Sequence, residues 1–219
     1  MRTHSWKQFT PFYFYTVVAG GLGAAAAISE ARSIIGIALL LLCGILSWGL
    51  VEYTLHRFVL HDDAPTKRSP SSALAEHAAH HDDPRAVGHL FVSVRASAPV
   101  ALCYGLLAWG VMGSWQAMAY LFIGLISGYF SYEWLHYQAH HGASRWRLLR
   151  YLKKYHLLHH HQTPDLRFGV TSPIVDYVFG TYQPVGKRAA PPTEQTVSIR
   201  RRGVGVVKKQ LSDLWVAPQ

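Results

Sequence analysis

Cysteine and charge are the two features that this 219-residue sequence has little of. Its two cysteines, Cys43 and Cys103, both lie within apolar stretches, so they provide neither a disulfide framework nor a cysteine-type zinc site. Only 15% of the residues are charged and 50% are hydrophobic, which excludes a disordered or fibrous chain. Because the two cysteines form no metal site, any metal chemistry must use ligands other than thiolates.

Asp, Glu, Lys and Arg are missing altogether from residues 11–29, 33–51 and 96–132. A helix of roughly 20 residues crosses the hydrocarbon layer of a bilayer, and the third stretch is long enough for two such helices that turn near Gly113. We therefore expect an all-α integral membrane protein. Its four spans are expected at about 11–30, 33–55, 93–113 and 115–136.

The distribution of basic residues predicts the orientation in the membrane. With four spans, the N-terminus, residues 56–90 and everything after 136 share one side. With Arg95 at the boundary counted to it, this side holds every Lys and Arg except Arg32 (21 − 1 = 20). The positive-inside rule makes this side cytoplasmic. Topology and anionic headgroups thus explain the net charge of +9 better than nucleic acid does, and no nucleic-acid motif is present. We expect a cytoplasmic helical cap at 56–90 and 136–182, followed by a tail at 183–219.

The first apolar stretch permits a second interpretation. Arg2 and Lys7, the apolar run after them and the small residues at 24–27 are also typical of a secretory signal with a cleavage site. Removing this segment would leave three spans and would still place both polar segments on the basic side.

Histidine is the residue in excess, because the chain has 14 and all but His4 lie within 56–89 and 136–161. They form four clusters with the patterns H-x4-H, H-x2-HH, H-x3-H and H-x2-HH. Residues three and four apart share a helix face, so each of the last three clusters can grip a metal. His56 and His61, five apart, diverge in a continuous helix, so either the helix ends between them or they serve different metals. The ten core positions are His56, His61, His77, His80, His81, His136, His140, His156, His159 and His160.

Ten imidazoles are too many for one ion, so the sequence predicts two. Imidazole suits iron, zinc, copper and nickel, whereas the carboxylate-rich ExxH pattern of soluble di-iron bundles is missing. A metal pair at the ends of apolar helices is well placed to meet a lipid chain. Oxygen chemistry on an unactivated C–H bond needs a redox metal, so we expect iron; zinc fits the same nitrogens without redox chemistry.

Carboxylates near the clusters are weaker candidates for supporting positions, because ligating histidines usually donate their second N–H to a carboxylate or carbonyl. The six candidates are Glu52 and Glu133, one helical turn before His56 and His136, and Asp62, Asp63, Asp82 and Asp83, directly after clusters. Four further histidines, His4, His89, His141 and His161, are expected to lie outside the ligand sets.

The histidine order resembles that of the fatty acid hydroxylase / sterol desaturase superfamily, most closely its fatty acid 2-hydroxylase branch. Four segments carry the resemblance further: EYTLHRFVLH (52–61), HYQAHH (136–141), LKKYHLLHH (152–160) and RFGVTSPIVDYVFGTY (167–182). The resemblance covers about residues 45–182. It implies a membrane diiron monooxygenase that uses O2 to hydroxylate carbon 2 of a long acyl chain, carried as a free acid, a thioester or a sphingolipid amide. It also implies that the ten core histidines bind the metals, and that zinc can occupy the site in purified protein.

The resemblance also bears on partners and location. Eukaryotic members of this branch begin with a cytochrome b5 domain bearing an HPGG motif, which this sequence does not contain. We therefore expect a separate ferredoxin- or cytochrome b5-type electron donor. The membrane is expected to be the bacterial inner membrane, or the endoplasmic reticulum if the source is eukaryotic.

Residues 173–179 are expected to form a short amphipathic helix. Ser172 suits its N-cap, Pro173 its first position and Gly180 its end. Ile174, Tyr177 and Val178 either close the site over the substrate or serve packing only.

Two other functions stay open. Related diiron membrane enzymes act on carotenoids or sterols, although the H-x3-H cluster and the GVTSPIVD segment favour an acyl substrate. A zinc-binding or metal-transporting membrane protein should instead carry ligands at the bilayer midplane, where the apolar stretches contain no histidine.

Overall fold

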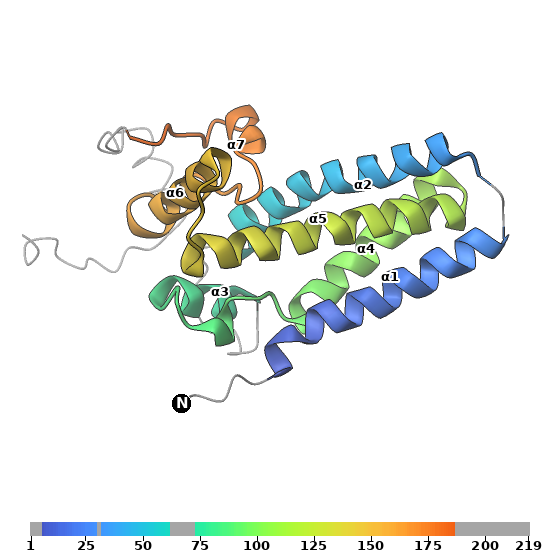
Figure 1. The fold of residues 1–219 in the computed structure, drawn as a ribbon, viewed down its shortest axis with the longest axis horizontal. Coiled ribbons are helices and arrows are strands. Elements are labelled where there is room, and N and C mark those ends of the chain that lie inside the picture. The colour runs from blue at the N-terminus through green and yellow to red at the C-terminus, as the bar shows by residue number, and fades with distance from the viewer. Residues whose placement is uncertain (1–5, 30–31, 62–72, 187–219) are drawn as a thin grey trace, which may run out of the picture. The chain divides into compact units, whose positions relative to one another are not determined.

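Helices are the only regular elements in residues 6–29, 32–61 and 73–186, the parts of the chain that the computed structural model describes (Figure 1). This confirms the expected all-α fold class. Seven α-helices follow one another: α1 (Thr10–Ser29), α2 (Ile34–Leu55), α3 (Ala73–Asp82), α4 (Val94–Met112), α5 (Trp115–His141), α6 (Arg147–His161) and α7 (Ile174–Val178). Three short helices are η1 (Trp6–Phe9), the π-helix η2 (His56–Leu60) and η3 (Val87–His89).

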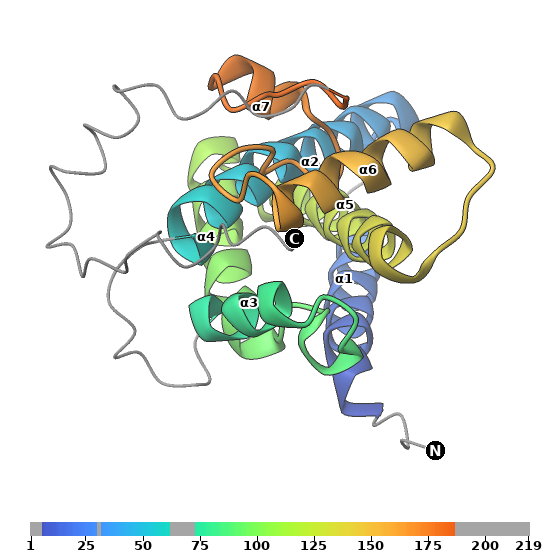
Figure 2. The same ribbon diagram turned by 90° about the vertical axis from the view of Figure 1, so that its left-hand side faces the viewer.

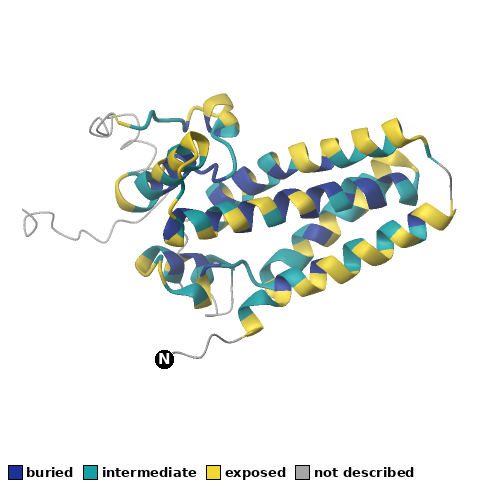
Figure 3. Cartoon of the chain, in the orientation of Figure 1, coloured by how far each residue is buried: buried dark blue, intermediate teal, exposed yellow. Residues whose placement is uncertain are grey.

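The four long helices α1, α2, α4 and α5 run beside one another, and α5 packs against each of the other three (Figure 1). Buried residues follow the length of α5, whereas much of the surface of α1, α2 and α4 is exposed (Figure 3). Serine N-caps begin α2, α4 and α5, and Gly113 in the left-handed conformation (φ +59°) ends α4 just before α5 starts. α5 is thus the central helix of this bundle.

Glycines allow α2 and α5 to approach closely. A Cβ atom built on Gly44 of α2 would lie 2.8 Å from the Cα of Gly124 on α5 and would also meet the carbonyl oxygen of Leu121. Similarly, a Cβ on Gly128 would lie 2.5 Å from the Cβ of Trp48. Small residues of this kind let helix backbones pack tightly where lipid provides no hydrophobic drive for association.

Three stretches of the described residues are long and apolar enough to cross a membrane, and they centre on α1, α2 and α4. Their bounds are Trp6–Ser29, Ile34–Leu60 and Val87–Met112. Apolar side chains such as Ile34, Leu46 and Val111 are exposed on them, as lipid-facing residues would be. The fourth expected span, 115–136, falls in α5, which is not one of these stretches, so the number of spans stays a prediction.

The remaining helices gather at one end of the long ones, where α2 and α5 finish (Figure 1). Figure 2 shows α6 crossing the end of α5, which it contacts, while α3 packs against η2. These elements form the described part of the expected cap. Of the expected tail, all but residues 183–186 lies outside the described residues.

Candidate metal centre

Ten histidine side chains converge at the end of the bundle and form two groups. In each group, one ring nitrogen from every member lies within 4.8 Å of the corresponding nitrogens of the others. These are the ten histidines that the sequence singled out; their role as metal ligands stays a prediction. The first histidine group is His56, His61, His77, His81 and His159, and the second histidine group is His80, His136, His140, His156 and His160.

The two H-x2-HH motifs each supply both groups. On α3, His77 and His81 belong to the first group while His80 belongs to the second. On α6 the assignment is reversed, because only His159, the middle histidine of its motif, belongs to the first group. Residues four apart share a helix face and the residue between them points to one side, so one helix can serve two ions.

The π-helix η2 explains how His56 and His61 reach the same group. The chain leaves the α-helical winding at His56, and the π-helix continues to Leu60. A π-helix closes i to i+5 instead of i to i+4, so two residues five apart come to lie on one face. The helix then ends at Leu60, directly before His61, so the helix end that the sequence suggested between these histidines is present.

The ring nitrogens are arranged as metal ligands would be. The Nε2 atoms of His61 and His77 are 3.0 Å apart, and those of His80 and His136 are 2.8 Å apart. The Nε2 atom of His56 is buried and has no hydrogen-bond partner among the described residues. Within each histidine group, ring nitrogens this close together fit one shared ion, with metal–nitrogen bonds of about 2.0–2.1 Å for a metal such as zinc. The unpartnered Nε2 of His56 fits the ion of the first group.

Burial also sets the protonation state of the histidines. It lowers the pKa of His61 to about 4, and burial together with neighbouring imidazoles lowers the pKa of His81 to about 4. The same two causes lower the pKa of His80 and of His140 to about 3. These side chains are therefore neutral at neutral pH, which is the form of imidazole that binds a metal.

Backbone carbonyls orient two members of the first histidine group. The Nδ1 of His56 lies 2.5 Å from the carbonyl oxygen of Phe168, and the Nδ1 of His159 lies 2.8 Å from that of Leu166. Since a carbonyl only accepts, each Nδ1 carries the proton and each Nε2 is left free for a metal. The sequence draws attention to residues 167–182 but does not reveal this role, because no pattern shows which carbonyls turn inward.

The two glutamates hold neighbouring loops. Glu52 accepts hydrogen bonds from the backbone N–H groups of Val170 and Thr171 and from the Thr171 hydroxyl. Glu133 accepts one from the N–H of Val92, at 2.9 Å. Both carboxylates are buried, and they support the segments on either side of the histidine groups.

Two of the four aspartates lie in the described residues. Asp82 and Asp83 are exposed, and Asp83 accepts a hydrogen bond from the backbone N–H of Arg85. Asp62 and Asp63 lie outside the described residues. Of the four remaining histidines, His89, His141 and His161 are exposed and belong to neither group, and His4 lies outside the described residues.

α7 differs from its expected role. Ile174, Tyr177 and Val178 are 69%, 75% and 71% exposed and do not line the cavity described below, so the expectation that they close the site is wrong. The inward residue is Asp176, which is fully buried. The helix starts after Pro173 and is followed by Gly180 at φ +72°.

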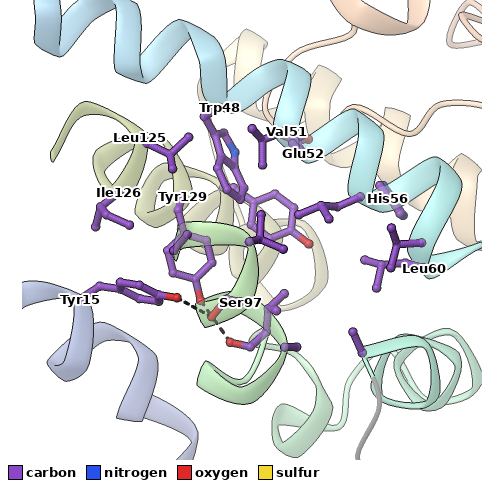
Figure 4. Close-up of a pocket in the computed structure, with 18 residues that line it drawn as sticks. Tyr15, Trp48, Val51, Glu52, His56, Leu60, Ser97, Leu125, Ile126 and Tyr129 are labelled. Carbon is purple, nitrogen blue, oxygen red and sulfur yellow. Dashed lines mark hydrogen bonds between the residues drawn. The ribbon is translucent and has the colours of Figure 1, made fainter. Parts of the chain in front are cut away.

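An apolar cavity of about 100 Å³ extends from the first histidine group into the bundle (Figure 4). His56 and Leu60 lie at one end, and Tyr15 and Ile126 lie toward the other, with Trp48 between them (Figure 4). A smaller hollow lined by histidines of both groups adjoins it, since both are lined by Leu60, Ala73, Val92 and Tyr132. The site thus combines a narrow apolar channel with the ring nitrogens.

Comparisons with known proteins agree with this geometry. The model of the fatty acid hydroxylase family matches residues 41–181. The dihydroceramide fatty acyl 2-hydroxylase FAH2 of Arabidopsis thaliana is 35% identical over 145 residues, covering 66% of this chain and 61% of that protein. The ceramide very long chain fatty acid hydroxylase SCS7 of Saccharomyces cerevisiae is 35% identical over 142 residues, covering 64% of this chain and 36% of that protein.

A solved structure is also similar to this chain. It is full-length scs7p, of which only the hydroxylase domain is visible, with a TM-score of 0.69 and 28% identity over 85% of this chain and 69% of that one. This chain covers less than two thirds of the length of either curated relative.

Proposed function

This chain belongs to the fatty acid hydroxylase family, and from that membership we propose that it is a membrane monooxygenase acting on a long-chain fatty acyl lipid, at carbon 2. The observation that carries the proposal is the apolar cavity that ends at His56, beside two groups of five histidines. We assign one iron ion to each histidine group. O2 is the oxidant, and a separate ferredoxin- or cytochrome b5-type protein supplies electrons.

The reaction converts one C–H bond and one O2 into one C–OH group and one water, and it consumes two electrons and two protons. When bound, two iron ions supply the O2 activation that an unactivated C–H bond requires. The protein's part is to keep ten imidazoles neutral and converging and to exclude water. Burial provides both. It lowers the histidine pKa values by desolvation, and the apolar side chains that line the cavity keep water out.

The cavity provides a reason for the position of attack. An acyl tail lying along Trp48, Leu125 and Ile126 leaves the carbons nearest the carbonyl beside His56 (Figure 4). Reaction needs atoms held within about 3–3.5 Å, so proximity selects these carbons over those deep in the tail. The named relatives act on ceramide or dihydroceramide acyl groups, so an amide-linked chain is the first substrate to test, before a free acid and a thioester.

We further propose that α5 is a fourth span and that the cap faces the cytoplasm. Four spans place 20 of the 21 Lys and Arg residues on the side of the histidine groups. The active site then lies at the cytoplasmic surface of the membrane, where a water-soluble electron donor can reach it.

Lipid mass spectrometry of a host with and without the chain tests the function, under ¹⁸O2 gas and with a reducing system supplied. We expect a 2-hydroxy acyl lipid that carries one ¹⁸O atom. Hydroxylation near the terminal methyl, a desaturated product or an oxygenated carotenoid would exclude carbon-2 acyl hydroxylation.

A pair of variants tests the cavity. Ala101 lines it from α4, so Ala101→Phe is expected to fill it and abolish the product while both metals stay bound. Leu107→Phe, at an exposed position of the same helix, is the matched control and should leave activity unchanged. Equal activity of the two variants would remove the cavity from the proposal.

A further inference from the structure

The loop that orients two histidines contains an unusual backbone conformation. Arg167 has φ +62° and is the one non-glycine residue with positive φ in the described parts of the chain. The left-handed conformation costs an L-residue roughly 1–2 kcal/mol, so the surrounding structure must enforce it. The carbonyls that bond to His159 and His56 belong to Leu166 and Phe168, the residues on either side. The turn at Arg167 is what allows both carbonyls to face the first histidine group.

Asp176 of α7 holds this turn in place. Its two carboxylate oxygens accept hydrogen bonds from the backbone N–H groups of Phe168 and Gly169, both at 2.8 Å, and one also accepts from the Thr181 hydroxyl at 2.7 Å. A Cβ on Gly169 would clash with the backbone carbonyl oxygen of Ser172 and would lie 2.9 Å from the Asp176 carboxylate, so only glycine fits here. The carboxylate is fully buried. It binds the N–H group of Phe168, whose carbonyl orients His56, and the N–H group of the next residue, Gly169.

Four of the five members of the second histidine group have no such support among the described residues. The Nδ1 atoms of His80, His136, His156 and His160 are buried, and none has a hydrogen-bond acceptor there. The carbonyl contacts from Leu166 and Phe168 reach the first group alone. The structure therefore treats the two metal positions unequally.

We propose that Asp176 is a positioning residue for one of the two metal sites, the one formed by the first histidine group. It fixes residues 166–169 so that two carbonyls set the tautomer and direction of His56 and His159, and it leaves the site of the second group untouched. This inference rests on the proposed metal-ligand role of the ten histidines. Loss of a hydrogen-bonding partner behind a ligand typically lowers metal affinity about 10–100-fold, so that is the expected effect at the first site.

Metal binding by the full-length chain in detergent tests the proposal without any measurement of activity. The metal-free protein is titrated with Zn²⁺ at defined free concentrations, and bound metal is counted by elemental analysis. Wild type should bind two ions. In Asp176→Asn one ion should bind about 10–100-fold more weakly while the other keeps its affinity. Asp83→Asn, an exposed carboxylate two residues after His81, is the matched control and should match wild type.

A second pair of variants separates the shape of the loop from the charge of Arg167. Arg167→Gly and Arg167→Val both remove the guanidinium, which donates to the Gln183 carbonyl at 3.1 Å and to Thr163. Glycine adopts positive φ freely, whereas a β-branched residue there is a steric outlier. Arg167→Gly should therefore keep both ions, and Arg167→Val should weaken one. This comparison remains decisive if Asp176→Asn does not fold.

Three results would overturn the inference while leaving the proposed function standing. Equal weakening of both ions in Asp176→Asn would mean general destabilisation, and unchanged binding of both would mean that the loop has no effect on the metals. Equal affinities of the two Arg167 variants would exclude the backbone conformation as the cause. Wild-type protein that binds fewer than two ions would instead refute the proposed diiron function itself, together with this inference.

Discussion

Replacing Gly44 with alanine is expected to force apart α2, which leads directly into His56, and α5, which carries His136 and His140. Its Cβ would lie 2.8 Å from the Cα of Gly124 and 2.9 Å from the backbone N of Leu125. Because these neighbours are backbone atoms of α5, a rotamer change cannot relieve the contact. His56 directly follows the last residue of α2, 12 residues beyond Gly44 and about 18 Å away at 1.5 Å per residue, so a displaced α2 moves this histidine with it.

The expected magnitude follows from two opposing effects. Overpacking of a close contact costs about 1–3 kcal/mol, and backbone atoms favour the upper half of this range. Alanine in place of glycine inside a helix returns about 0.5–1 kcal/mol. The net loss is then about 1–2.5 kcal/mol, and at about 2–4 °C per kcal/mol for a chain of this size the Tm should fall by about 2–10 °C.

Thermal melting of the metal-loaded protein in detergent measures this change, and bound metal is counted in the same samples. Gly20→Ala on α1 is the matched control, because a Cβ there has no atom within 4 Å. It should melt at or slightly above the wild-type temperature. A Gly44→Ala protein that melts as high as wild type and binds two ions would show that the close approach of α2 and α5 is not required.

Three further predictions concern the ligands, the pH response and the orientation. His80→Ala and His156→Ala should abolish hydroxylation and lower the metal content measured by elemental analysis, whereas His161→Ala, exposed and outside both groups, should keep two ions. The metal-free protein should lose stability as pH falls from about 6.5 toward 4. Histidines of the unfolded chain take up protons in this interval, while burial holds the pKa of His61 and of His81 near 4 in the folded protein. A constant Tm from about pH 6.5 to about pH 4 would contradict this. Reporter fusions after residue 85 and after residue 219 should both read cytoplasmic, and an opposite signal at either would exclude the four-span topology.

Spacing along the sequence identified the histidines that meet, but not how they divide between the two histidine groups. Helical periodicity places His77, His80 and His81 near one face of α3, and this much is local. That His80 joins histidines of α5 and α6, while its neighbour His81 joins the other group, depends on where those helices pack. Periodicity within one helix contains no information on that packing.

Contacts between distant segments explain the other differences. Glu52 precedes His56 by one turn, yet its side chain bonds to Val170 and Thr171, more than a hundred residues further along the chain. The amphipathic pattern of α7 placed Ile174, Tyr177 and Val178 on its inward face, but these side chains are exposed. The buried face is the one with Asp176, because its carboxylate satisfies two backbone N–H groups that would otherwise be unpaired.

The π-helix at His56–Leu60 has a consequence for how this sequence can vary over evolution. A π turn contains one residue more than an α turn, so the H-x4-H of η2 and the H-x3-H of α5 are two solutions to the same geometric requirement. Deleting a single residue between His56 and His61 would produce the second solution from the first, with both imidazoles still on one face. Sequences related to this one are therefore expected to carry either H-x4-H or H-x3-H at the first of these motifs.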